Sequence, residues 1–151
     1  MKRLKIKVYC NGVKKSDLPQ ILNLLGQLST STFAKNRKII QEISHWREVM
    51  KKSFLINVRD MKKEGNPIVG MATLIPHIQS LGRFGNIQDV IVDEQYRGCG
   101  VGAMLWKEIV KISKENNFSR VDLTSSKPKA QKWYKKLGFE EHKTKFFRKN
   151  L

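Results

Sequence analysis

The chain has 151 residues, which is enough for one domain with a buried core and too short for two comfortable ones. Hydrophobic residues make up 40% and charged residues 28% of it, as in ordinary globular proteins, and no apolar run approaches the roughly 18 residues of a membrane span. The net charge of +17 fits either a polyanionic ligand, such as a phosphorylated molecule or nucleic acid, or a solvated surface rich in lysine pairs.

The first half of the chain predicts an edge strand, two helices and a two-stranded hairpin. Residues 3–9 alternate apolar and basic side chains, which is typical of a half-buried strand, and Asn11-Gly12 then turns the chain. Ser16 or Asp17 is expected to cap a helix that ends at the polar run 29–32. The other elements expected here are a helix over 36–50, a strand over 54–58, a turn over 62–66 and a second arm over 68–78.

The second half predicts a strand, a glycine-rich loop and a long helix. A flexible connection over 81–85 leads into the β-branched strand 87–92, and apolar residues from Val101 to Ile112 recur at helical spacing. The remaining predicted elements are a strand over 121–125, a helix from Pro128 to Leu137 ended by Gly138, and a closing strand or hairpin over 139–148. This order predicts a mixed α/β sandwich around one sheet.

Three glycines, Gly98, Gly100 and Gly102, stand between the predicted strand and the long helix. Glycine lets the backbone approach a ligand closely, and the unpaired amides of a helix's first turn attract phosphate. A Walker loop would require Lys-Ser or Lys-Thr after the glycines, and neither is present. A dinucleotide fingerprint would stand early in a βαβ repeat, whereas this loop lies two-thirds of the way along. The loop therefore predicts a phosphate site of a third kind.

The cysteines and histidines are scattered and show no metal-ligand spacing. Cys10 and Cys99 are far apart, which favours a reducing cytoplasm over a disulfide framework, and we expect no metal site. The basic N-terminus lacks the apolar stretch of a signal peptide, so a cytoplasmic location is expected. Cys99, at a predicted helix N-terminus, is either a reactive thiol or a small outward-facing side chain.

Two motifs resemble the Gcn5-related N-acetyltransferases. Arg97-x-x-Gly100-x-Gly102 after a strand is similar to their pyrophosphate-binding loop, and residues 130–139 are similar to their Asn-x-x-Ala-x-x-x-Tyr-x-x-x-Gly-Phe segment. The positions in register in that segment are Ala130, Tyr134, Gly138 and Phe139. The resemblance implies an α/β, single-domain acetyltransferase (GNAT) fold over 1–151, with a mixed, mostly antiparallel sheet, splayed central strands and flanking helices. It also implies acetyl-coenzyme A as cosubstrate.

Four segments narrow the resemblance to the glucosamine 6-phosphate N-acetyltransferases. They are Leu25-Gly26-Gln27-Leu28-Ser29, residues 68–75, Gln88-Asp89-Val90-Ile91-Val92 and Tyr134-Lys135-Lys136-Leu137-Gly138-Phe139. Two positions depart from that family: Ser29 replaces a phosphate-contacting Thr but keeps the hydroxyl, and Gln88 replaces a Glu and loses its charge. The resemblance implies a homodimer with the substrate site at its interface, a place in UDP-N-acetylglucosamine biosynthesis, and no nucleic-acid or membrane partner.

Acetyl transfer to an amine requires a neutral amine, a donor for the developing oxyanion and a proton for the leaving thiolate. By resemblance, the Val90 amide serves the thioester carbonyl and the Tyr134 hydroxyl serves the sulfur, while Asp89 acts as a base or orients the sugar. The expected cofactor-binding residues are Val90, Ile91, Val92, Arg97, Gly98, Cys99, Gly100, Val101, Gly102, Ser125, Lys127 and Tyr134, with Lys127 standing where the family often has Asn. The expected substrate-binding residues are Ser29, Gln88, Asp89 and Arg148, the last reaching the partner's substrate.

The leading hypothesis is therefore direct attack of the glucosamine 6-phosphate amine on the thioester. A different amine acceptor, such as a polyamine, an antibiotic, a protein lysine or a protein N-terminus, is the second hypothesis. A basic nucleic-acid-binding module is the third, although no recognisable binding motif supports it. The simpler alternatives for the key residues are a packing role for Tyr134 and a solvated position for Arg148.

Overall fold

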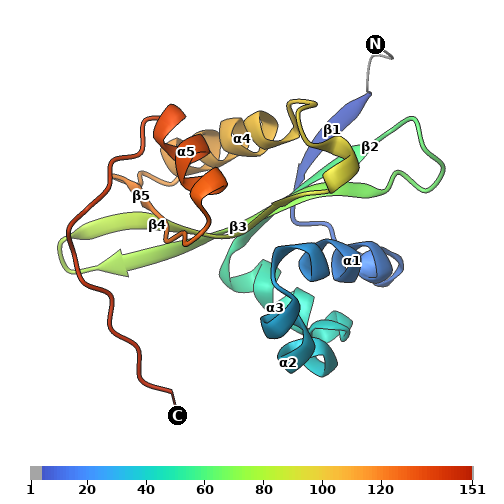
Figure 1. The fold of residues 1–151 in the computed structure, drawn as a ribbon, viewed down its shortest axis with the longest axis horizontal. Helices are drawn as coiled ribbons and strands as arrows, with labels where there is room; N and C mark the ends of the chain where they lie inside the picture. Colours follow the sequence, from blue (N-terminus) through green and yellow to red (C-terminus); the bar gives the residue numbers. More distant parts are fainter. Residues whose placement is uncertain (1–4, 151) are drawn as a thin grey trace.

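The protein is described by a computed structural model that covers residues 5–150, with only the backbone described at residues 30–33. Its centre is a five-stranded sheet whose spatial order follows the chain (Figure 1). The strands are β1 (Ile6–Cys10), β2 (Phe54–Asp60), β3 (Ile68–Gln79), β4 (Gly82–Val92) and β5 (Val121–Asp122). The first four pair antiparallel, and β5 runs parallel to β4. The expected mixed, mostly antiparallel sheet is thus confirmed, with β1 at its edge; Leu4 of the predicted first strand lies outside the described residues.

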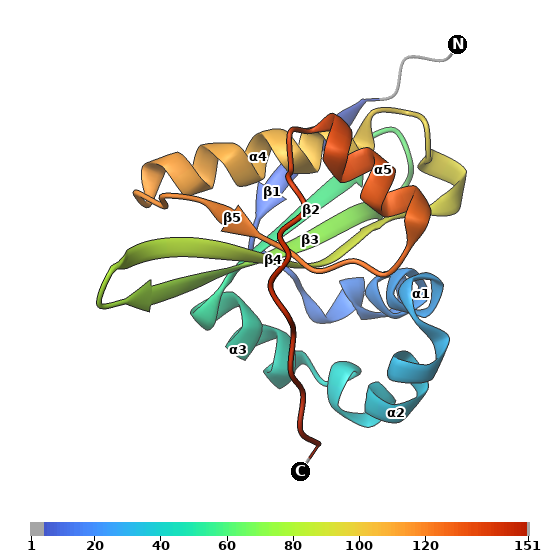
Figure 2. The same ribbon diagram turned by 60° about the vertical axis from the view of Figure 1, so that its left-hand side comes forward.

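Helices cover both faces of the sheet. Figure 1 shows α4 and α5 on one face and α1, α2 and α3 on the other, and Figure 2 shows the same layers after rotation. Their bounds are Leu18–Leu28 for α1, Thr30–Ile40 for α2, Ile43–Lys52 for α3, Val101–Glu115 for α4 and Pro128–Lys136 for α5. Short 3-10 turns stand at Lys15–Asp17 and Glu94–Tyr96. No helix among the described residues is long and apolar enough to cross a bilayer.

Each face of the sheet has its own hydrophobic core. Successive strand residues point to opposite faces, so Leu55 packs with Ile21 and Trp46 under α1 and α3, while Ile56 packs with Leu105 under α4. Because both faces are covered, β2 and β3 are buried along most of their length, and the run of apolar residues at the start of β3 reflects this. The helical spacing that predicted α4 is confirmed, because Val101, Leu105, Ile109 and Ile112 are all buried.

Two predicted elements near the site are corrected by the structure. The single helix expected over 36–50 is two helices, because the chain turns at Gln41 and Glu42 and the Trp46 indole donates a 2.7 Å hydrogen bond to the Ile40 carbonyl. The connection expected over 81–85 instead begins β4. Gly85 is required for close packing rather than flexibility, since a Cβ there would lie 2.6 Å from the Leu74 Cδ1 atom.

The C-terminal segment forms no strand. Residues 137–150 contain neither helix nor strand, whereas a closing strand or hairpin was expected over 139–148. The last strand, β5, has only two residues, so it offers a very short edge for further pairing. Phe146 and Phe147 on this tail are 70% and 84% exposed. In Figures 1 and 2 the tail leaves the end of α5 and runs away from that helix.

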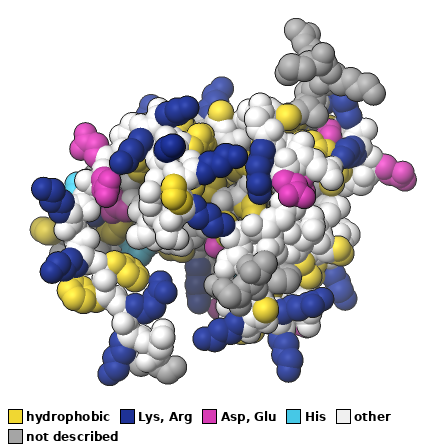
Figure 3. All heavy atoms as spheres, viewed as in Figure 1, with side chains coloured by type: hydrophobic (Ala, Val, Ile, Leu, Met, Phe, Trp, Pro, Cys, Tyr) yellow, Lys and Arg dark blue, Asp and Glu magenta, His cyan; other side chains and the backbone are white. Residues whose placement is uncertain are grey.

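Lysine and arginine side chains are spread widely over the surface. Figure 3 shows them over most elements of one face rather than gathered in a single patch. For this face the arrangement favours a solvated basic surface over a dedicated polyanion-binding one.

Candidate functional site

Strands β4 and β5 separate soon after they meet. They pair only at Gly85 with Val121 and at Asn86 with Asp122, so residues 87–92 of β4 have no neighbour on that side in the described sheet. The splayed central strands expected from the sequence are therefore present. The carboxyl ends of parallel strands are where open α/β sheets commonly bind ligands, and here the backbone edge of β4 is available to one.

A β-bulge lies on this open part of β4. Pairing with β3 passes from Ile91 opposite Met71 to Gln88 opposite Thr73, so Asp89 and Val90 together oppose one residue, Ala72. Asp89 has a φ of +51°, in the left-handed region that side chains other than glycine rarely adopt. Bulges of this kind redirect the chain beside active sites, and this one interrupts the ladder at Val90.

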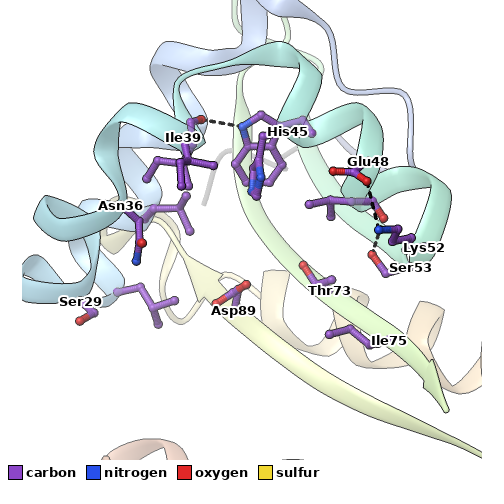
Figure 4. Close-up of a pocket in the computed structure, with 15 residues that line it drawn as sticks. Ser29, Asn36, Ile39, His45, Glu48, Lys52, Ser53, Thr73, Ile75 and Asp89 are labelled. Atoms are coloured by element: carbon purple, nitrogen blue, oxygen red, sulfur yellow. Dashed lines mark hydrogen bonds and ion pairs between the residues drawn. The ribbon is translucent and has the colours of Figure 1, made fainter. Parts of the chain in front are cut away.

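Asp89 opens onto a cavity of about 790 Å³ between the sheet and helices α1–α3. Figure 4 shows Ser29 at one end, Asp89 and Thr73 on the floor, and His45, Glu48 and Lys52 on the helical side. Much of the remaining wall is apolar, with contributions from Leu25, Leu28, Ile40, Trp46 and Val49. The cavity is thus a mainly apolar chamber with a few convergent polar groups, which is the usual character of a small-molecule site.

Burial by the cavity walls raises the pKa of the Asp89 carboxyl. Asp89 is exposed to solvent, but it faces the cavity, and the cavity walls remove part of the hydration of its carboxyl. In its ionised form Asp89 can attract an ammonium group, and its carboxyl oxygens can accept a hydrogen bond.

Helix α3 supplies polar groups that the sequence reasoning missed. His45, Glu48 and Lys52 line the cavity, and the Lys52 Nζ lies 3.0 Å from a Glu48 carboxylate oxygen. Their spacing of three and four residues places them on one face of a helix, beside the apolar stripe that the sequence did indicate. That pattern could have identified them from the sequence, but only if α3 had been predicted as a helix distinct from α2.

The glycine loop joins the end of β4 to the first turn of α4. Gly98 and Gly100 have φ values of +79° and +84°, and a Cβ at either would meet no described atom within 4 Å. The loop is therefore open at these two positions. The Arg97 Nε donates to the Val92 carbonyl at 3.2 Å, which folds this side chain back toward the strand. Cys99 is exposed in the same loop.

Gly102 has a packing role that the sequence did not indicate, and its predicted contact with the cofactor stays a prediction. A Cβ at this position would lie 3.2 Å from the Cζ2 atom of Trp133, so glycine allows α4 and α5 to pack closely. Val101 is likewise buried, at 1% exposure, and Ile91 is 5% exposed, so any cofactor contact from these two residues is through the backbone.

Tyr134 packs in an aromatic group on α5. Its ring lies 5.0 Å from that of Trp133 and 5.5 Å from that of Phe139. Burial raises the pKa of the Tyr134 hydroxyl, which is therefore protonated at neutral pH and able to donate. These ring contacts pack one part of the side chain, and the hydroxyl has no described hydrogen-bond partner.

The other predicted site residues lie in three places. Ser125 and Lys127 stand just after β5, where the Ser125 Oγ accepts a hydrogen bond from the Lys127 amide at 3.4 Å. Gln88 lies on β4 opposite Thr73 and donates to Asn86. Arg148 is on the exposed tail, with its guanidinium 5.3 Å from the Phe146 ring centre, and it does not line the cavity of its own chain. No cluster of three or more His, Cys, Asp or Glu side chains suited to a metal ion occurs in residues 5–150.

Comparison with known proteins gives consistent matches over most of the chain. Residues 19–139 match the acetyltransferase (GNAT) family. The chain is 32% identical over 133 residues to a glucosamine 6-phosphate N-acetyltransferase of Trypanosoma brucei brucei, covering 86% of this chain and 87% of that one.

Solved structures show the same fold. A Trypanosoma brucei acetyltransferase superposes with a TM-score of 0.70 at 26% identity, covering 97% of this chain and all of that one. A glucosamine-6-phosphate N-acetyltransferase of Arabidopsis thaliana gives a TM-score of 0.71 at 19% identity, covering 96% and 98%. The bulged β4, its open edge and the glycine loop thus lie in a chain that belongs to the acetyltransferase (GNAT) family and is an acetyl-coenzyme A-dependent N-acetyltransferase.

Proposed function

We propose that the protein acetylates the amine of glucosamine 6-phosphate to give N-acetylglucosamine 6-phosphate, a step of UDP-N-acetylglucosamine biosynthesis. The observation that carries this proposal is the cavity. Its lining includes both Ser29, from the first of the four motif segments, and Asp89, from the third. Asp89 can attract the sugar's ammonium or accept from its hydroxyls, and Ser29 can donate to a phosphate. The similarity to the trypanosomal enzyme over 86% of this chain supports the same substrate.

The open edge of β4 and the glycine loop fit acetyl-coenzyme A. Residues 87–92 present an unpaired strand edge to which an extended amide-containing arm can bond, and the loop at Gly98 and Gly100 has open space for a pyrophosphate. Acetyl-coenzyme A supplies an activated thioester, so positioning of the two substrates can provide much of the rate.

Three residues carry the chemistry in this proposal. The Val90 amide, at the bulge where the ladder is interrupted, donates to the oxygen on which negative charge develops. Asp89 orients the acceptor as its amine, in the neutral form, attacks the thioester carbonyl. The protonated Tyr134 hydroxyl donates to the departing sulfur as the carbon–sulfur bond breaks, and the proton that the attacking nitrogen loses balances the one gained by the coenzyme A thiol.

The direct test is release of coenzyme A across a panel of amines. The panel contains glucosamine 6-phosphate, glucosamine, a polyamine, an aminoglycoside and a lysine peptide, each with acetyl-coenzyme A. We expect the highest kcat/KM for glucosamine 6-phosphate. A higher value for any other member would replace the proposed acceptor while leaving the acetyltransferase activity in place.

Arg148→Ala is expected to lower kcat/KM for glucosamine 6-phosphate about 30-fold and to leave KM for acetyl-coenzyme A unchanged. We propose that Arg148 reaches the phosphate in a partner chain of a homodimer, where its planar fork can form two charge-assisted hydrogen bonds. Activity on glucosamine should hardly change, because that sugar has no phosphate. Steady-state kinetics with both sugars measure this, and Lys145→Ala on the same exposed tail is the matched control.

Mixed dimers test whether Arg148 acts on the partner's substrate. A chain carrying Tyr134→Phe and a chain carrying Arg148→Ala are each expected to be weakly active alone. Co-expressed, they form dimers in which one site has both wild-type residues, so activity should recover. No recovery in isolated mixed dimers would place Arg148 at its own chain's site or outside the sites altogether.

A further inference from the structure

A lysine connects two distant parts of the site. The Lys127 Nζ donates a 2.5 Å hydrogen bond to the Leu28 carbonyl, although the two residues are 99 positions apart in the sequence. Leu28 is the last residue of α1, and Lys127 immediately precedes α5, just after β5. From the sequence, Lys127 was expected among the cofactor contacts, which remains a prediction; in the structure its ammonium group points to the end of α1.

The contact spans the open ends of the two splayed strands. Gln27, next to Leu28, donates to Asp93 at 3.4 Å and accepts from the Glu94 amide at 3.1 Å, so the end of α1 is fastened to the chain just beyond β4. Lys127 is on the segment just beyond β5. Its side chain therefore bridges the opening between β4 and β5 on the side where Leu28 and Ser29 line the cavity.

The charge on Lys127 is uncompensated. One lysine, Lys52, lines the cavity, and Figure 4 shows it at the end opposite Ser29; Lys127 reaches the other end through its bond to the carbonyl of Leu28, a lining residue. Lys52 forms an ion pair with Glu48 at 3.0 Å. In residues 5–150 Lys127 has no carboxylate partner, and its one described side-chain bond is to a neutral carbonyl, which leaves two ammonium hydrogens for another acceptor.

We infer that Lys127 binds the phosphate of the acceptor together with Ser29, and so helps to select a phosphorylated amino sugar. The inference rests on the proposed function and deepens it. A phosphate at the Ser29 end of the cavity leaves the rest of the sugar directed along the floor toward Asp89 and the bulge. Lys127 thus acts within its own chain, independently of any residue that a partner contributes.

A purely structural role is the alternative. A cation at the C-terminal end of α1 complements the negative end of the helix and satisfies one of its last carbonyls. That role would affect stability and both sugars equally. A lysine that binds the acceptor's phosphate would instead affect the phosphorylated sugar and not the unphosphorylated one.

The test compares Lys127→Met with Lys129→Met. Both changes remove one positive charge near the start of α5 and keep a long unbranched side chain, but of the two only Lys127 has a described bond to Leu28, which lines the cavity. We expect Lys127→Met to raise KM for glucosamine 6-phosphate about 10-fold, with KM for acetyl-coenzyme A and kcat/KM for glucosamine within about twofold of wild type. Lys129→Met should match wild type, and Lys127→Arg should recover most of the loss.

The possible failures are distinguishable. A rise in KM for acetyl-coenzyme A instead would make Lys127 a cofactor contact, and equal losses with both sugars would make it structural; either result overturns the inference but not the proposed function. A wild-type enzyme that prefers glucosamine or another amine would overturn both.

Discussion

Tyr134→Phe is expected to lower kcat on the order of 100-fold while KM for acetyl-coenzyme A stays within about twofold. The phenyl ring keeps its packing against Trp133 and Phe139, so the α5 surface should remain in place. The substitution removes only the hydroxyl. In the wild-type protein burial raises the pKa of this hydroxyl, so it is protonated at neutral pH and can act as a donor. A donor to the leaving sulfur acts when charge builds in the transition state, not when the cofactor binds.

Tyr9→Phe is the matched control for the loss of a hydroxyl. Tyr9 lies on the edge strand β1, where its hydroxyl contacts the sulfur of Met61. Single-turnover measurements should be used, so that product release does not mask the chemical step. If Tyr134→Phe reacts at the wild-type rate in a single turnover, Tyr134 is a packing residue and another group must serve the sulfur.

The sequence predicted the site best where function depends on local chain geometry. The glycine loop, the β-branched strand before it and the buried face of α4 are contiguous, and their backbone conformations follow from residue type. Gly100, for example, adopts the left-handed conformation that glycine tolerates best. The order of the strands and the split between β4 and β5 came from resemblance, because no local pattern specifies how far two parallel strands stay paired.

The acceptor cavity depended on contacts that sequence spacing does not reveal. His45 and Lys52 became site residues only because α3 folds over the sheet, and the break between α2 and α3 is fixed by the bond from Trp46 to Ile40. The contact of Lys127 with Leu28 was not predicted for the same reason, since the two residues are 99 positions apart. The glycines of 81–85 indicated flexibility, whereas Gly85 serves close packing against Leu74.

Gly100→Val is expected to raise KM for acetyl-coenzyme A on the order of 100-fold. A Cβ at this position meets no described atom within 4 Å, so the added isopropyl group would project into the open space that we assign to the pyrophosphate. It would also hold phosphate oxygens away from the first amides of α4, which begins at Val101. Titration of acetyl-coenzyme A by calorimetry, alongside steady-state kinetics, measures the effect on binding directly.

Gly65→Val separates lost binding from backbone strain. Gly65 lies in the turn between β2 and β3, has a φ of +74° and is equally open, so valine there carries a similar cost of about 1–2 kcal/mol. Both variants should therefore show similar reductions in the free energy of unfolding, because both force a β-branched residue into the left-handed region. Only Gly100→Val should lose affinity for acetyl-coenzyme A. Equal cofactor affinities in the two folded variants would remove the loop at Gly100 from the binding site, and the open edge of β4 would then have to bind the cofactor without it.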